Sequence, residues 1–214
     1  MSMIELIIAM GLTAIILVTV GGFLGAAEKA SVLNGAVDRN TRTASNAMKE
    51  MERTLRVATA NPEQASLTDD PAFIIAAAED VKFYAYVNLA SAEEQPVIVE
   101  FKVDPTTRNL VEYQYASTPI TTGYWSYAAA PTRTTVLGGP VSVQTSGGQP
   151  LFTYAGSDGS AVPTDSTGAV SGTTNLRSID SVAIKLEVGS TTAGARSNVL
   201  MSNTVGMVNL GQAN

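Results

Sequence analysis

The sequence predicts an α+β fold in which one long N-terminal helix packs against an antiparallel β-sheet head. Residues 6–27 carry no charge, and this apolar run is long enough for a helix that crosses a hydrocarbon core of about 30 Å. From residue 81 onward the apolar positions recur with a period of two, which is typical of β-strands. A helical segment followed by a run of strands indicates the α+β class.

The predicted helix has two halves of different character. Residues 1–28 form a hydrophobic transmembrane or filament-core segment, and residues 29–60 continue it as an amphipathic helix with apolar or small residues on one face. Pro62 predicts the end of the helix. Because such a helix would be about 85 Å long, we expect lipid or other subunits to cover its first half and the chain's own head to cover its second half.

Residues 61–214 are predicted to form the β-rich globular head. The residues DPTTRN (104–109) have the composition of a turn between two antiparallel strands. The region of about 117–174 is rich in Gly, Ser and Thr and predicts long surface loops with one or two short strands. The strongest strand patterns are VKFYAYVNLA, PVIVEFKVD, NLVEYQYA, IDSVAIKLEV and SNVLMSNTVGMVNLG.

Charge is unevenly distributed along the chain. Of the 13 bases and 19 acids, six bases and five acids precede residue 61, so the head holds seven bases and fourteen acids. An acidic head disfavours nonspecific binding to nucleic acid or to an anionic membrane surface. We therefore infer no nucleic-acid partner.

Most catalytic chemistry lacks its usual residues in this chain. There is no Cys and no His, which excludes disulfides, zinc–thiolate sites, thiol nucleophiles and histidine bases. The segment SDGSAVPTDS (157–166) offers only Asp158 and Asp165 as carboxylate ligands, fewer than a calcium loop needs. We predict no catalytic residues, no metal, no cofactor and no enzymatic activity.

A single acid, Glu5, interrupts the start of the apolar run. A charged side chain at membrane depth costs about 3 kcal/mol, so an acid there usually has a partner and a function. The pattern MSMIELIIAMGL has an apolar first residue, a small Ser2, Glu5 and then an unbroken apolar run. It resembles the mature N-terminus of the type IV pilins and pilin-like proteins, which include pseudopilins and minor pilins. The resemblance is tight from residue 1 to about residue 30 and loose to about residue 60.

The resemblance implies a pilin fold and roles for specific residues. Met1 would be the N-methylated residue left by a prepilin peptidase, although it stands where Phe is commoner and could instead be an initiator. Glu5 would pair with the Met1 amine of a neighbouring subunit during assembly. Three glycines, at the position where many pilins carry a Pro, would weaken the helix: Gly21, Gly22 and Gly25. The expected filament-core residues are Leu6, Ile7, Ile8, Leu12, Ile15, Ile16, Leu17, Val18, Phe23 and Leu24.

The function that this resemblance implies is structural. The chain would be a subunit of a type IV pilus, a helical homo-oligomer on the cell surface that serves motility, adhesion or DNA uptake. Before assembly it would reside in the cytoplasmic membrane, where the prepilin peptidase and the pilus assembly platform would be its partners. One alternative is a minor pilin or a pseudopilin of a type II secretion-like system. Another is a single-pass anchored surface binding module, which would not need Glu5.

An aromatic cluster, Tyr124, Trp125 and Tyr127, lies within the predicted loop region. These rings could form an adhesive or glycan-stacking patch on the surface. The interpretation that we prefer is that they hold a long loop against the head or fill an interface between subunits. Trp125 is the only Trp in the chain.

Overall fold

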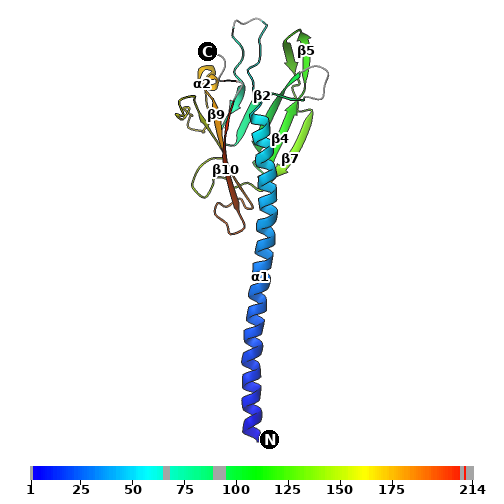
Figure 1. Ribbon diagram of the computed structural model, residues 1–214, viewed down its shortest axis with the longest axis vertical. Helices are drawn as coiled ribbons and strands as arrows, with labels where there is room; N and C mark the ends of the chain where they lie inside the picture. Colours follow the sequence, from blue (N-terminus) through cyan, green and yellow to red (C-terminus); the bar gives the residue numbers. More distant parts are fainter. Residues whose placement is uncertain (1, 65–67, 89–94, 208–209, 211–214) are drawn as a thin grey trace.

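The structure is a computed structural model that describes residues 2–64, 68–88, 95–207 and 210. A β-rich head sits at one end of a helix that projects far beyond it (Figure 1). The elements are α1 (Met3–Leu55), β1 (Phe73–Ala76), β2 (Asp80–Asn88), β3 (Gln95–Val103), β4 (Leu110–Tyr115), β5 (Ser117–Thr121), β6 (Tyr124–Tyr127), β7 (Arg133–Gly138), β8 (Phe152–Ala155), α2 (Thr173–Arg177), β9 (Ser181–Val188) and β10 (Val199–Gly206). The predicted α+β class, with one long helix packed against antiparallel sheets, is confirmed.

Among the described residues, the strands form two main sheets and one ribbon, and every pairing between these strands is antiparallel. One sheet has the order β1-β2-β3-β4-β7, the other has the order β10-β9-β8, and β5 pairs with β6. The predicted hairpin between β3 and β4 is present. Its turn is closed by Asp104, whose Oδ1 accepts hydrogen bonds from the backbone N–H groups of Thr106 and Thr107 at 3.0 and 2.6 Å.

The second half of α1 packs against both main sheets. It contacts β9 and β10 of one sheet and β7 and β2 of the other. The buried positions recur every three or four residues, which places them on one helix face: Ala44, Ala47, Met48, Met51, Thr54 and Leu55. This face meets a core of buried aromatic rings in which Phe83 lies 5.9 Å from Phe73 and 6.1 Å from Phe101, centroid to centroid. The amphipathic half is therefore covered by the chain's own head, as expected.

The helix ends five residues earlier than the predicted boundary at residue 60. It stops at Leu55, and Ala58 forms an isolated antiparallel bridge with Ala85 of β2. The backbone N–H of Thr59 donates to the carbonyl of Tyr84 at 2.9 Å. The sheet thus captures the backbone before Pro62 can end the helix, a tertiary contact that overrides the local signal.

The region 117–174 holds more regular structure than the predicted long loops. It contains β5, β6, β7 and β8 as well as the start of α2. The strand β7 completes the five-stranded sheet at its edge, and β8 completes the edge of the three-stranded sheet. The prediction of one or two short strands was wrong because edge strands and hairpins tolerate the Thr, Ser and Gly residues that made this region resemble loops.

Two glycines allow the head to approach α1 closely. Gly138 ends β7 with φ +142°, and a Cβ there would collide with the side chain of Thr43. Gly189 follows β9 with φ +137°, and a Cβ there would lie 2.6 Å from Asn40 Nδ2 and 2.9 Å from Ser197 O. Asn40 Nδ2 also donates to Ser197 O at 2.7 Å. Both sheets therefore reach the same stretch of helix through residues without a side chain.

Replacing Gly189 by Ala is expected to destabilise the head by about 2 kcal/mol, because the added Cβ meets Asn40 and the backbone conformation is strained for an L residue. Thermal unfolding followed by circular dichroism measures the loss. Gly148→Ala is the matched control, since Gly148 also has a positive φ but a Cβ there meets nothing within 4 Å. Equal destabilisation by the two changes would show that backbone strain, and not the close approach to α1, sets the cost.

Candidate assembly surface

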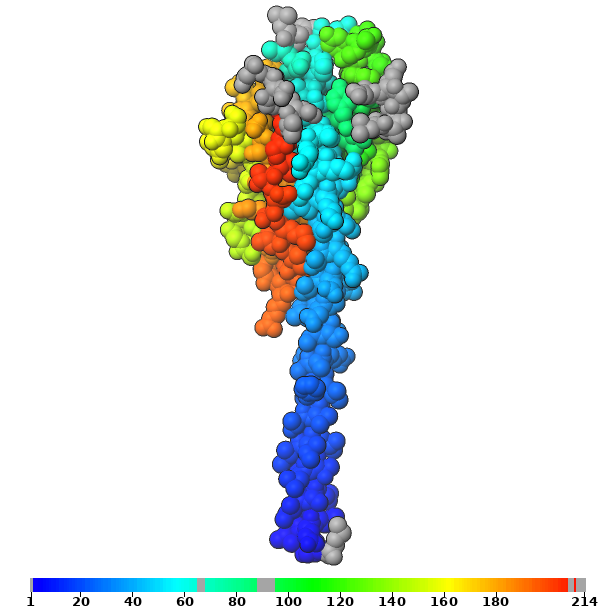
Figure 2. All heavy atoms as spheres, in the orientation of Figure 1, coloured from blue at the N-terminus to red at the C-terminus, as the bar shows by residue number. Residues whose placement is uncertain are grey.

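The first half of α1 extends away from the head and exposes its apolar side chains on all sides. A window of this helix has a mean hydropathy of 2.5, and none of it is buried. Every predicted filament-core residue is exposed, from 52% for Leu6 to 76% for Val18. In Figure 2 this half is a bare stalk with no head atoms around it. By length and composition, the helix is apolar enough to cross a membrane.

The start of the helix is a capping box that the sequence analysis missed. Ser2 is the N-cap residue, and its Oγ accepts from the backbone N–H of Ile4 at 3.4 Å. The carboxylate of Glu5 accepts from the backbone N–H of Ser2 at 2.8 Å. The signal was present as Ser-x-x-Glu before an apolar run. Met1, the predicted partner of Glu5, lies outside the described residues.

The two Thr hydroxyls of the stalk are satisfied within the helix. The hydroxyls of Thr13 and Thr19 donate to the carbonyls of Ala9 and Ile15, one turn earlier, at 2.8 Å each. These bonds let Thr remain in an apolar environment without an unpaired donor.

The helix is continuous through the three predicted helix-weakening glycines, Gly21, Gly22 and Gly25. A Cβ at any of them would meet nothing within 4 Å. No contact among the residues that the structure describes explains these glycines, and they leave shallow sites where another helix can approach the backbone.

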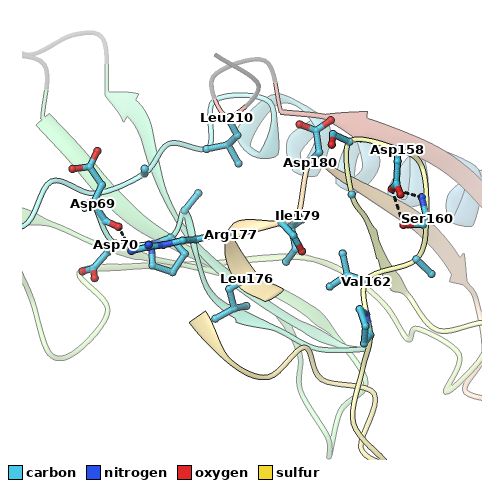
Figure 3. Close-up of a pocket in the computed structure, with 18 of the residues that line it drawn as sticks. Asp69, Asp70, Asp158, Ser160, Val162, Leu176, Arg177, Ile179, Asp180 and Leu210 are labelled. Atoms are coloured by element: carbon cyan, nitrogen blue, oxygen red, sulfur yellow. Dashed lines mark hydrogen bonds between the residues drawn. The ribbon is translucent and has the colours of Figure 1, made fainter. Parts of the chain in front are cut away.

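A groove of about 870 Å³ lies beside α2 on the head (Figure 3). Its wall includes the buried Ile179, and Asp158 and Asp180 lie on its rim. Arg177 is the basic residue of the lining, and its guanidinium donates to the backbone carbonyl of Asp69 at 2.5 Å.

The segment of residues 157–166, which was considered above as a calcium loop, has two carboxylates, and both stabilise turns. Asp158 Oδ1 accepts from the N–H and Oγ of Ser160 at 2.9 and 2.6 Å. Asp165 Oδ1 accepts from the N–H and Oγ1 of Thr167 at 2.8 and 2.6 Å. These hydrogen bonds lower the pKa of both carboxyls below the usual range. Within residues 2–64, 68–88, 95–207 and 210, no group of three or more His, Cys, Asp or Glu side chains is arranged to hold a metal ion.

The aromatic cluster belongs to strand β6 of the β5–β6 ribbon. The hydroxyl of Tyr127 donates to Asn61 Oδ1 at 2.7 Å, and its ring lies 5.1 Å from the ring of Tyr84 on β2. Tyr127 therefore fastens the ribbon to the chain that follows α1. Tyr124 and Trp125 are half-buried and line a smaller hollow beside it.

Comparison with known proteins leaves the family of this chain open. No model of a known protein family matches the sequence, and no curated protein matches it either. The stalk, its capping box and the aromatic ribbon are thus the features from which function is inferred.

Proposed function

We propose that this chain is a structural subunit of a type IV pilus or a closely similar filament, assembled through the first half of α1. The single observation that carries the proposal is the apolar stalk, which the chain's own head leaves uncovered. Contact with water over this surface would cost roughly 1.5–3 kcal/mol for each large apolar side chain. The stalk therefore resides in the cytoplasmic membrane before assembly and among the helices of other copies afterwards.

Packing, not escape from water, drives this transfer. Lipid tails are as apolar as the stalk, so the exchange of lipid for helix neighbours is nearly neutral in hydrophobic free energy. Close helix contact then depends on small residues, which the stalk supplies at Gly21, Gly22 and Gly25. A nearly balanced exchange also lets a subunit return to the membrane, as a retractable filament requires.

Glu5 selects the position of each arriving subunit in this proposal. One carboxylate oxygen accepts from Ser2, and the other has no hydrogen-bond partner among the described residues. A positive Met1 amine on a neighbouring copy would pair with it, since a buried acid is tolerated when it is paired. The prepilin peptidase that exposes this amine and the assembly platform are the partners that follow from the proposal.

Analysis of surface structures sheared from producing cells tests the proposal. We expect filaments by electron microscopy, with this chain as a component that begins at Met1 and carries an added methyl group by mass spectrometry. The abundance of the chain in the filament distinguishes a major pilin from a minor pilin or pseudopilin. Recovery of the chain only from membranes, as single copies without methylation, would overturn the proposal.

A second candidate function is a single-pass anchored surface module that does not assemble. The capping box favours it, because Glu5 then serves to begin the helix and needs no second subunit. In that case the stalk is only a membrane anchor, and the head acts alone.

A further inference from the structure

The aromatic ribbon forms one wall of a hollow of about 400 Å³ on the head. The opposite wall comes from the chain directly after α1, which includes Asn61, Glu63 and Gln64. In Figure 1 the β5–β6 ribbon lies at the end of the head farthest from the N-terminus. The hollow therefore lies at the end of the head far from the part of the stalk that a membrane would hold.

The hollow is held in shape by contacts within the head. The backbones of Asn61 and Asp70 exchange two hydrogen bonds, at 3.2 and 2.8 Å, which fix the wall that follows α1. The Tyr127 hydroxyl joins this wall to β6, and the ring of Tyr84 supports Tyr127 from β2. A site with fixed walls loses little freedom when a ligand binds.

Several polar side chains line the hollow beside the aromatic rings. Asn61 Oδ1 accepts the hydrogen bond of the Tyr127 hydroxyl. The indole of Trp125, the hydroxyl-bearing ring of Tyr84 and the acidic residue Glu63 belong to the same lining. Donors, acceptors and aromatic faces thus converge on one small space.

We infer that this hollow binds a neutral sugar unit of an extracellular carbohydrate. The apolar C–H face of a sugar ring stacks on Trp and Tyr rings, while its hydroxyls bond to amide and carboxylate groups. Glu63 and Asp70 disfavour sialic and uronic acids, because their negative charges repel the carboxylate of an acidic sugar. Burial and these two carboxylates raise the pKa of Tyr84, which places their charge at the hollow. The inference does not depend on filament formation.

The binding test uses the full chain in lipid vesicles that contain no other protein and are prepared without sugar-based detergents. Because Trp125 is the only Trp, its fluorescence reports directly on the hollow. We expect neutral oligosaccharides such as lactose, chitotriose or cellotriose to change the emission saturably at millimolar concentration, whereas 3′-sialyllactose binds about tenfold more weakly. Choline is the competing probe, since aromatic rings beside carboxylates also suit a quaternary ammonium. Saturation by choline with no response to any neutral sugar would overturn the inference.

Two variants locate the site, with binding followed by saturation-transfer NMR. Trp125→Ala is expected to weaken binding of the neutral sugar about tenfold, while Tyr113→Ala, which removes a ring outside the hollow, leaves it unchanged. Glu63 is exposed and forms no ion pair with the described residues, so Glu63→Gln preserves the fold. Because this change removes one negative charge from the hollow, it should reduce the ratio of the affinity for the neutral sugar to the affinity for 3′-sialyllactose. Unchanged affinity in Trp125→Ala, or an unchanged preference in folded Glu63→Gln, would place the sugar elsewhere and refute the assignment.

Discussion

Glu5→Gln is expected to abolish filament formation while the chain still inserts into the membrane. Gln can occupy the third helical position of a capping box, so the helix begins as before. Only the negative charge is lost, and with it the proposed pairing with the amine of a neighbouring Met1. Without this charge, no electrostatic attraction holds an arriving subunit at one axial position. Electron microscopy and the amount of chain in the sheared fraction measure the effect.

A set of three variants separates the charge from the cap. Glu5→Asp keeps the charge on a shorter side chain and should restore part of the assembly, whereas Ser2→Ala removes a cap worth about 1 kcal/mol and keeps the charge. Immunoblots of the membrane fraction confirm that each variant is inserted. Normal filaments from Glu5→Gln would show that this residue only begins the helix, and the anchored-module function would then be preferred.

Glu187→Ala is expected to destabilise the head by about 3 kcal/mol, an effect visible as a fall of about 10 °C in the unfolding midpoint. Glu187 is 2% exposed, and its carboxylate accepts from Ser146 N at 2.6 Å, from Gly194 N at 2.6 Å and from Asn198 Nδ2 at 2.7 Å. Removing it leaves three donors without their acceptor.

A control for this change is Asp158→Ala, which removes an acid from an exposed turn and should alter the midpoint little. Differential scanning calorimetry of the full chain in micelles gives both values. If both variants unfold at the wild-type temperature, water replaces the carboxylate at Glu187 and the loops do not depend on it.

The buried carboxylate of Glu187 should make the stability of the head sensitive to acid. Burial raises the pKa of Glu187, but the hydrogen bonds from Asn198, Gly194 and Ser146 lower it more, so the net pKa lies below the usual value. A carboxyl with a depressed pKa stabilises the fold above its unfolded pKa of about 4.3, and this contribution is lost as the pH falls through the folded value. The stability of Glu187→Gln should therefore fall less steeply below about pH 4 than that of the wild type. Parallel pH profiles would contradict this assignment.

The sequence predicted the elements correctly where the spacing of apolar residues was regular. The apolar run of residues 6–27, the buried face of the amphipathic half and the alternating strands β2, β3, β4 and β9 all followed from spacing alone. The edge strand β7 was missed, because it needs only one paired neighbour and its sequence has little apolar alternation. The predicted end of the helix was wrong because Ala58 pairs with β2. The residues around Ala58 contain no pattern that predicts this long-range pairing.

Some features of the candidate sites could be predicted from the sequence, whereas others depend on contacts between distant parts of the chain. Glu5 and the exposed stalk could be recognised because a charge in an apolar run is costly, whatever the tertiary structure. The hollow beside Trp125 could not be found from the aromatic cluster alone, since its other wall comes from Asn61 and Gln64, far away in the chain. The role of Glu187 as an acceptor for three donors likewise depends on loops that only folding brings together.

The close approach of the head to α1 has a mechanical consequence. Strand β10 runs lengthwise beside the helix, as Figures 1 and 2 show, and pairs with β9 along its whole length. A tensile load along the helix axis therefore acts on the head in shear and stretches many contacts at once, instead of peeling strands apart in sequence. Because Gly138 and Gly189 bring both sheets onto the helix, the load divides between two sheets. Such an attachment resists force best in the direction in which the helix would be pulled.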